Sequence, residues 1–473
     1  MNELVSFFSK WKRYLFYIIG SSAIISLLLT GKLSDSYMSL ILIPVCYIIA
    51  KFFILKNINT SDHFFLIQLF IVSFTICLIS VFIFAYILEF YIGIPFLSYK
   101  DDFTYNESAL QIVERWRQSG IGFYPDIRFS TGFYSGFPNV SAFFMYIFGD
   151  SVYVPRIANA FFSAITCLWA YRICLNYAER TKSRLVAVLF AVSPLLFIHS
   201  SLQLKDTILL FFTFGSIKAT IDIFQRKKVL KNMFLFLICA VGIIFFRAAT
   251  IIVIGGAILI YFIAAKANKR KGSALLSVIF IAIAFGGIFY SWQYLTSLEV
   301  INSYEMYFES RYDGMISTDL EDSNAGVAKL SIAKILGAPV YMLFCFFLPP
   351  ASVVAFSDTD TINYTLFGLL FHYALLPFLV VAFIKVIRNW KKEPIALFIL
   401  VSFFIFKLGL TNALLSALSP RQSLGSIYLM YLLLPFYFRK NANSQKIQKI
   451  VLLLSIMVLF AFALVRIYSR GLL

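Results

Sequence analysis

The sequence predicts an all-α membrane protein that crosses the bilayer many times. Sixty per cent of its 473 residues are hydrophobic and only 14% are charged, and the mean hydropathy is +0.85. Soluble domains usually carry about 25% charged residues. Apolar runs of about 17–25 residues recur along the chain, separated by short charged segments. Backbone polar groups must be satisfied within such a segment in lipid, so we expect each run to be a helix.

Taken in order, the apolar runs predict about 13 transmembrane helices. The first run follows Lys10, Lys12 and Arg13 and is too long for the apolar part of a signal peptide, so it is expected to be retained as a span. Arg247 divides the run 232–265, which is too long for one helix and slightly short for two. The expected spans are 14–31, 37–55, 64–93, 153–177, 185–201, 207–225, 232–246, 248–265, 273–291, 364–387, 394–411, 424–438 and 449–467.

The spans leave two larger polar segments, which we expect on the outer side of the membrane. The first, residues 94–137, carries Asp101 and Asp102 and leads into the run 137–149. This run is too short to cross and predicts a juxtamembrane helix that lies in the outer interface or dips back into the membrane. The second, residues 292–334, is rich in Asp and Glu, and prolines interrupt the following segment 335–357, which suggests a re-entrant segment. No repeat or linker is evident, so residues 1–473 are expected to form one transmembrane domain.

The net charge of +18 is explained by topology rather than by nucleic acid. Every loop that the layout places inside is basic and nearly free of acids, as the positive-inside rule requires. These loops carry Arg180, Lys182 and Arg184; Arg226, Lys227, Lys228 and Lys231; Lys266, Lys269, Arg270 and Lys271; Lys385, Arg388, Lys391 and Lys392; and Arg439, Lys440, Lys446 and Lys449. Nucleic acid is therefore not an expected partner, whereas membrane lipids are.

The cysteines and histidines do not predict a metal centre. All six cysteines fall in apolar runs without CxxC or Cys/His spacing, and the three histidines are far apart. No metal site and no cofactor are expected. A divalent cation beside Asp101 and Asp102 would be chemically compatible, but no ligand pattern indicates one.

The first motif with chemical potential is Asp101-Asp102-x-x-Tyr105-x-x-x-Ala109, at the start of an expected helix. A carboxylate at the outer membrane surface could accept the proton of an acceptor hydroxyl, as general base catalysis requires. The alternative is structural, because Asp is also favoured as a helix N-cap.

The second group of motifs is Phe148-Gly149-Asp150-Ser151, Pro155-Arg156, Ser193-Pro194 and Lys205-Asp206. Asp206 opens the span that begins near residue 207, with Lys205 beside it. Taken alone, a Lys-Asp pair at a membrane boundary is more often a capping and snorkelling arrangement than a binding site.

In their order along the chain, these motifs resemble those of the GT-C membrane glycosyltransferases. The resemblance is strongest to the branch of the protein O-mannosyltransferases and of the aminoarabinose and lipid-linked-sugar transferases of bacterial envelopes. It covers about residues 85–225, with Pro420-Arg421 before a late span as weaker support.

The resemblance implies a GT-C-like fold and transfer of a sugar from a polyprenyl-phosphate-linked donor on the outer face. The protein would then be a multi-pass protein of a bacterial plasma (inner) membrane. By the same resemblance, Asp101 or Asp102 would be the catalytic base, the first acid being favoured, and Asp206 a second carboxylate of the site. The departing phosphate needs cations, and the candidates are Arg156, Lys205, Arg247 and Arg421, each of which could instead be an interfacial side chain that snorkels to lipid headgroups.

Two other functions remain open. An envelope polysaccharide polymerase of the O-antigen type shares many spans and charged outer loops, and 94–137 and 292–334 would suit it equally. A lipid-linked sugar flippase or transporter would predict charges within the spans and paired repeats. Apart from Arg247 and Glu89, few such charges occur, so the transporter ranks last. The sequence assigns neither the sugar nor the acceptor.

Overall fold

The computed structural model describes residues 33–50, 60–97, 101–124, 136–247, 366–390, 392–413 and 424–438, with a few residues near 250–259 and 449–457. Several expectations fall outside these residues: the spans 14–31 and 273–291, the outer segment 292–334, the re-entrant segment 335–357, Arg421, and most of the spans 248–265 and 449–467.

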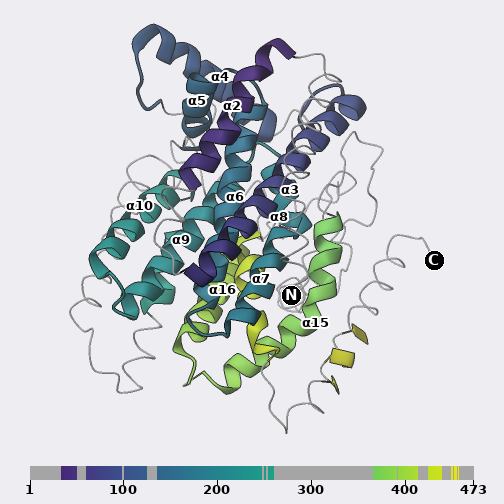
Figure 1. The fold of residues 1–473 in the computed structure, drawn as a ribbon, viewed down its shortest axis with the longest axis vertical. Coiled ribbons are helices and arrows are strands. Elements are labelled where there is room, and N and C mark those ends of the chain that lie inside the picture. Colours follow the sequence, from purple (N-terminus) through teal and green to yellow (C-terminus); the bar gives the residue numbers. More distant parts are fainter. Residues whose placement is uncertain are drawn as a thin grey trace. The chain divides into compact units, whose positions relative to one another are not determined.

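The described residues form helices and turns, with no strand among them, which confirms the all-α fold (Figure 1). The helices are α2 (Leu33–Ile49), α3 (Thr60–Ile92), α4 (Asp101–Ser119), α5 (Gly136–Phe148), α6 (Tyr153–Cys174), α7 (Arg180–Ala191), α8 (Pro194–Ser200), α9 (Asp206–Phe224), α10 (Val229–Arg247), α15 (Leu366–Arg388), α16 (Pro394–Ala413), α17 (Leu424–Tyr431) and the 3-10 turn η4 (Leu434–Phe436).

Five of these helices, α3, α6, α9, α10 and α15, are long and apolar enough to cross a membrane. Helices α7 and α8 together would make a sixth span, although they are bent by 46° at their junction. The expected number of about 13 spans is therefore not confirmed. The protein is nevertheless a multi-pass membrane protein.

The break between α7 and α8 interrupts the expected span 185–201 and has a local cause. Pro194 is the first residue of α8, and Ser193 before it is extended, with φ −69° and ψ 119°. Proline has no N–H to donate and disfavours the helical conformation in the residue before it, so it is favoured in the first turn of a helix and often ends the helix that precedes it. A helix, α5 (Gly136–Phe148), is present where the juxtamembrane helix was expected.

The chain divides into two compact units. The first contains α2 to α6, the end of α7, α8, α9 and α10. The second contains the connection from α6 to α7, the start of α7, and the helices from α15 to α17. In the second unit, the ring of His372 stacks on Tyr431 at 5.7 Å, and Lys385 donates a hydrogen bond of 3.0 Å to the Tyr437 carbonyl.

Helices α3 and α6 pack antiparallel in the first unit. Near the start of α3, Asp62 accepts a 3.0 Å hydrogen bond from the Tyr171 hydroxyl, near the end of α6. At the opposite end, the rings of Phe82 and Tyr153 lie 5.4 Å apart. With 33 residues, α3 is about 50 Å long, which exceeds the bilayer core of about 30 Å.

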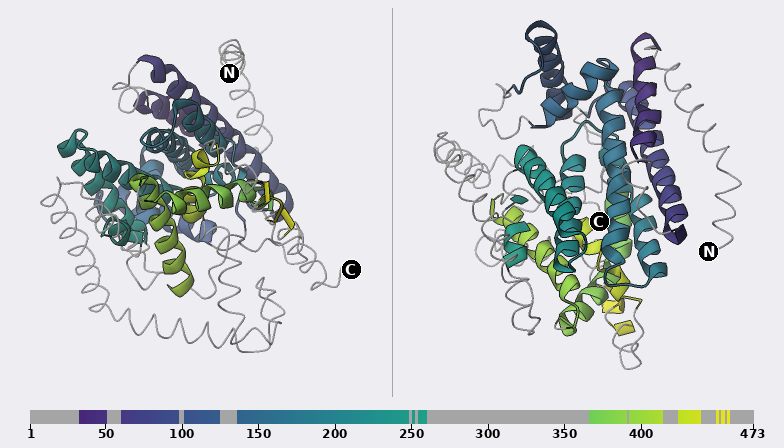
Figure 2. Two further views of the ribbon diagram at one scale, coloured as in Figure 1. Left: turned by 90° about the horizontal axis from the view of Figure 1, so that it is seen from below. Right: turned by 60° about the vertical axis from the view of Figure 1, so that its left-hand side comes forward.

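Helices α9 and α10 form an antiparallel pair, which lies side by side in every view (Figures 1 and 2). Glycines permit the close approach: a Cβ on Gly215 of α9 would lie 2.7 Å from the Cys239 Sγ of α10, and one on Gly242 of α10 would lie 2.6 Å from the Phe212 ring of α9. Small residues at helix contacts serve the same purpose in membrane proteins generally.

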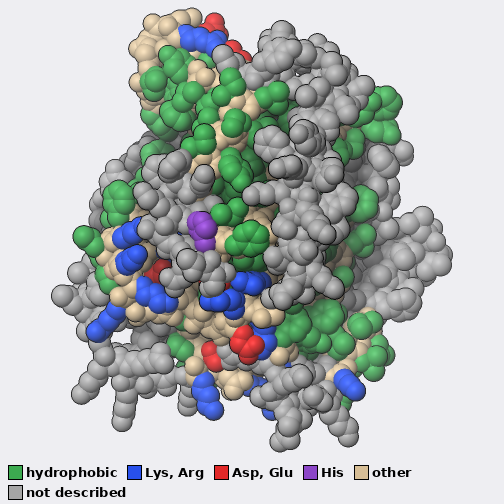
Figure 3. Space-filling model, in the orientation of Figure 1, with side chains coloured by type: hydrophobic (Ala, Val, Ile, Leu, Met, Phe, Trp, Pro, Cys, Tyr) green, Lys and Arg blue, Asp and Glu red, His purple; other side chains and the backbone are tan. Residues whose placement is uncertain are grey.

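The outward face of α10 is apolar, with exposed side chains at Leu230, Phe234, Leu237, Val241 and Phe245. Hydrophobic side chains are also abundant on the visible described surface (Figure 3). An exposed apolar surface of this kind suits contact with lipid. The connection from α9 to α10 is basic, with Arg226, Lys227 and Lys228, and the opposite end of the pair carries Asp206 and Arg247.

Candidate active site

The carboxylate pair lies where the chain leaves α3 and enters α4. Gly93 ends α3 with a φ of +78°, which favours glycine, and its N–H donates a 3.0 Å hydrogen bond to the Glu89 carbonyl. Helix α4 begins at Asp101. The two acids therefore occupy its first turn, where the helix dipole favours negative charge.

The two neighbouring acids differ in exposure. Asp101 is exposed, whereas only 1% of the Asp102 side chain is accessible. Asp102 accepts hydrogen bonds from the backbone N–H groups of Leu97 and Phe103, at 2.8 and 3.0 Å. Burial raises the pKa of the Asp102 carboxyl above its usual value, although the Leu97 N–H and the positive charge of Arg156 act in the opposite direction. Asp102 is thus held by the protein, and Asp101 is open to solvent.

Arg156, in the first turn of α6, is completely buried and binds the connection between α3 and α4. Its Nη2 donates a hydrogen bond to the Pro95 carbonyl, and its guanidinium lies 5.4 Å from the centre of the Phe96 ring. The carboxylates of Asp102 and Glu89 interact electrostatically with it. Its Nε and Nη1 have no hydrogen-bond partner among the described residues.

Lys205 and Asp206 are brought to α4 from a different part of the sequence. Asp206 is the first residue of α9, and each of the two side chains is only 5% exposed. The Lys205 ammonium lies 5.9 Å from the centre of the Tyr105 ring. Tyr105 lies one turn after Asp101 on α4, so the start of α9 is adjacent to the first turns of α4, the carboxylate helix.

Arg247 lies near the same helices, at the last position of α10, and is half-buried. Its neighbour Phe246 has its ring 6.4 Å from that of Phe137 on α5, and the Phe137 ring is 5.2 Å from that of Tyr105. The backbones also meet, because a Cβ on Gly136 would lie 2.4 Å from the Phe245 carbonyl oxygen. The end of α10 is therefore fixed against the start of α5.

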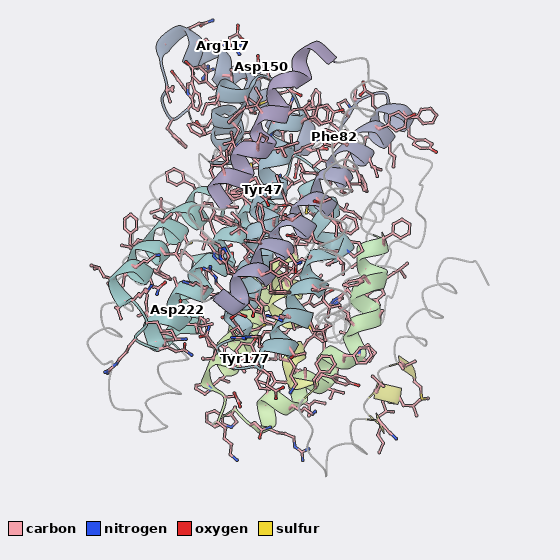
Figure 4. All side chains as sticks on the ribbon, viewed as in Figure 1. Tyr47, Phe82, Arg117, Asp150, Tyr177 and Asp222 are labelled. Carbon is pink, nitrogen blue, oxygen red and sulfur yellow. The ribbon has the colours of Figure 1, made fainter. Side chains whose placement is uncertain are left out.

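The far end of α4 is joined to the turn between α5 and α6. Arg117 and Asp150, labelled in Figure 4, form a bidentate ion pair with N–O distances of 2.9 and 3.0 Å. Asn139 on α5 accepts a hydrogen bond from the Tyr124 N–H and donates one to the Tyr124 carbonyl. These contacts make α4 and α5 a hairpin over the ends of α3, α6 and α10. Asp150, which belongs to one of the sequence motifs, therefore forms an ion pair that holds α4 to the turn between α5 and α6.

The structure therefore brings together Asp102, Arg156, Lys205 and Asp206, with Asp101 exposed at the same helix start and Arg247 nearby. Sequence reasoning missed Asn159, a buried amide of α6 that contacts the connection before Lys205. Its signal was present, because a polar residue one turn after Arg156 is unusual within an apolar span.

This arrangement combines carboxylates with buried cations at one end of the helices. A carboxylate can accept a proton, and a preorganised cation can stabilise a departing anion. Within the described part of the chain, no cluster of three or more His, Cys, Asp or Glu side chains could hold a metal ion.

Comparison with known families gives a match to the model described as dolichyl-phosphate-mannose-protein mannosyltransferase. Neither the curated proteins nor the solved structures contain a significant match. The family match spans residues 136–292 and includes Arg156, Lys205, Asp206 and Arg247, but it begins after Asp101 and Asp102. The resemblance to the GT-C type membrane glycosyltransferases is thus confirmed over residues 136–292, the part of the chain that matches this mannosyltransferase family.

Proposed function

We propose that this protein is a membrane glycosyltransferase that transfers a sugar from a polyprenyl-phosphate-linked donor to an envelope acceptor. The observation that carries the proposal is that the Asp101–Asp102 pair and the Lys205–Asp206 pair, which are distant in the sequence, meet beside buried cations. Lys205 reaches over the ring of Tyr105 on the helix that begins with Asp101 and Asp102, and Arg156 binds the connection before that helix. The family match supports the same donor class.

In the proposed reaction, an acceptor hydroxyl attacks the anomeric carbon of the donor sugar. A new glycosidic C–O bond forms as the bond from the sugar to the phosphate oxygen breaks. The electron pair leaves with the polyprenyl phosphate, and the hydroxyl proton passes to a carboxylate of the protein. No oxidant or other co-reactant is needed.

Asp101 is the carboxylate that we assign as base. It is exposed at the start of α4, so an acceptor from the aqueous side can reach it. Asp102 already accepts hydrogen bonds from Leu97 and Phe103 and interacts with Arg156. We therefore assign to Asp102 the orientation of α4, and to Asp206 a supporting role at the opposite side of the site.

The departing phosphate requires a cation at the same end of the helices. Lys205 and Arg247 are the leading candidates. The Lys205 ammonium lies over the Tyr105 ring, and Arg247 ends α10, where its neighbour Phe246 contacts the Phe137 ring. Two guanidinium nitrogens of Arg156, Nε and Nη1, have no hydrogen-bond partner among the described residues, but its Nη2 is used by the Pro95 carbonyl. Arg421 lies outside the described residues, and the sequence alone makes it a candidate.

The site is assigned to the outer face on the basis of charge. The basic connection from Arg226 to Lys228 lies at the opposite end of α9 and α10 from Asp206 and Arg247. Because basic loops stay on the cytoplasmic side, the carboxylates would face outward.

The full-length protein, reconstituted in membranes that contain its native acceptors, tests this function. Labelled polyprenyl-phosphate mannose is supplied first, followed by other polyprenyl-phosphate sugars. We expect label to leave the lipid and polyprenyl phosphate to be released. Asp101→Asn should lower transfer about 10²–10⁴-fold, the usual contribution of a general base. Glu114→Gln, which removes an exposed carboxylate from the same helix, should leave transfer unchanged.

Other results would point to the competing functions. Growth of a glycan chain on the lipid carrier, from lipid-linked oligosaccharide as both donor and acceptor, would indicate a polymerase. Movement of intact labelled lipid between leaflets without release of phosphate would indicate a transporter. If transfer occurs but Asp101→Asn matches the parent protein, the role of base passes to Asp102 or Asp206.

A further inference from the structure

Asn159 lies on α6 one turn after Arg156, on the same face of the helix. Both side chains are completely buried, as is that of Ser163 one turn further on. A polar side chain is costly inside a membrane-spanning helix unless it is paired or has a function. The partner of Asn159 is the connection between α8 and α9.

The side-chain amide of Asn159 donates hydrogen bonds to two backbone carbonyls of that connection. Its Nδ2 lies 2.9 Å from the Leu202 carbonyl oxygen and 3.1 Å from that of Leu204. The connection, residues 201–205, is not helical, so these carbonyls do not accept the regular hydrogen bonds of a helix interior. The Leu202 carbonyl also accepts a hydrogen bond of 2.9 Å from the Leu204 N–H. One amide therefore holds the chain on both sides of Gln203.

The position of this connection determines where α9 begins. Leu204 directly precedes Lys205, the N-cap of α9, and Asp206, its first residue. Lys205 extends from there to the Tyr105 ring on α4. By holding Leu204, Asn159 thus sets the position of Lys205 and Asp206 relative to the carboxylate helix.

Arg156 makes a comparable contact with the other connection. Its Nη2 binds the carbonyl of Pro95, which precedes Asp101 and Asp102. Two successive turns of α6 therefore hold both connections, the one that leads to Asp101 and Asp102 and the one that leads to Lys205 and Asp206. Both connections are thereby attached to one helix, α6.

We propose that Asn159 is a positioning residue, which holds Lys205 and Asp206 against the Asp101–Asp102 end of α4 during sugar transfer. This inference rests on the glycosyltransferase function proposed above. A displacement of about 1 Å in a positioned group can slow an enzyme about 100-fold. Asn159→Leu keeps a similar volume but removes the N–H donors, and it is expected to lower kcat about 10- to 100-fold.

A double-mutant cycle between Asn159→Leu and Lys205→Gln tests the inference. If Asn159 acts through Lys205 and Asp206, Asn159→Leu should lower kcat much less in the Lys205→Gln background than in the parent protein. An equal factor in both backgrounds would mean that Asn159 has only a general structural role, and would overturn the inference. Ser163→Ala is the matched control, because it removes a buried hydroxyl from the same face that has no partner among the described residues.

Hydrogen–deuterium exchange of the purified full-length protein gives a second readout, which does not depend on activity. Asn159→Leu should accelerate exchange in peptides that cover residues 200–210, whereas Ser163→Ala should not. Unchanged exchange there would overturn the inference. Accelerated exchange in a protein whose parent form transfers no sugar would support the role of Asn159 in holding the connection and reject the proposed function separately.

Discussion

The Lys205 ammonium lies 5.9 Å from the centre of the Tyr105 ring, and this contact joins the start of α9 to the carboxylate helix α4. Both residues are buried, at 5% and 2% exposed. A cation over an aromatic face contributes about 0.5–2 kcal/mol, more when it is desolvated. The ring of Tyr105 is itself fixed against that of Phe137. The contact therefore holds a cation near the two acids that begin α4.

Replacement of Lys205 tests its role toward the donor phosphate. Lys205→Gln should lower turnover about 10²–10³-fold, because one preorganised donor to a developing oxyanion is worth about 2.7–4 kcal/mol. Tyr105→Phe keeps the ring and should retain most activity, whereas Tyr105→Leu should lower it. Transfer rate per amount of inserted protein is the measurement, and Lys227→Gln, an exposed lysine at the other end of α9, is the control. A Lys205→Gln variant as active as the parent would leave Arg247, Arg156 or Arg421 to bind the phosphate.

The buried carboxyl of Asp102 should make stability depend on pH. Burial raises its pKa above the usual value of 3.8, so the native protein takes up this proton at a higher pH than the unfolded chain does. The stabilisation associated with the protonated carboxyl is complete below the usual pKa and is lost as pH rises through the native pKa.

Thermal unfolding of the purified protein at several pH values measures this effect. Relative to Asp102→Asn, which cannot ionise, the parent protein should lose melting temperature as pH rises from about 4 to about 8. A difference that grows in the opposite direction would show that Arg156 and the backbone N–H groups favour the ionised form more strongly than burial disfavours it.

The lengths of the apolar runs predicted some helices, such as α9 and α10, but did not predict which acid is buried. The spans expected at 207–225 and 232–246 correspond to α9 and α10, within a few residues. The exposure of Asp101 and the burial of Asp102 depend on how Leu97 and Arg156 contact the first turn of α4. The contact with Leu97 is local, five residues away, whereas the contact with Arg156 joins α6 to α4, two segments distant in sequence, which a local pattern does not encode.

Asn159 likewise has partners that its local sequence does not predict. Its polarity within an apolar span was visible, but its partners, the Leu202 and Leu204 carbonyls, lie more than 40 residues away in sequence. Backbone carbonyls carry no signature in the sequence. By contrast, the break between α7 and α8 has a local cause in Pro194, although the span expected at 185–201 ran through this residue.

Single-cysteine labelling can establish the orientation of the helices. In a cysteine-free variant, a cysteine at Glu114, which is exposed on α4, should react with an impermeant reagent from the outer side of the membrane. A cysteine at Lys227, exposed between α9 and α10, should react only after the membrane is permeabilised. Asp206 is unsuitable as a labelling site because it is buried. The reverse pattern would place the carboxylates on the cytoplasmic side and would be incompatible with transfer on the outer face.

The contact between Gly136 and the end of α10 should be intolerant of even one added carbon. A Cβ at this position would lie 2.4 Å from the Phe245 carbonyl oxygen and 2.8 Å from its carbonyl carbon, both of which are backbone atoms that cannot rotate away. Overpacking of this kind costs typically about 1–3 kcal/mol. Because α5 also bears Phe137 against Tyr105, its displacement should disturb the site as well as the fold.

Gly136→Ala should therefore lower both the melting temperature and the transfer rate. Gly122→Ala is the matched control, since a Cβ there would meet its nearest atom at 3.9 Å and should be accommodated. Equal melting temperatures and transfer rates for the two variants would mean that α5 does not press against α10 in the membrane. A loss of transfer in Gly136→Ala at an unchanged melting temperature would instead show that the contact serves mainly to place Tyr105 and Arg247, because α5 links these two residues through Phe137 and Phe246.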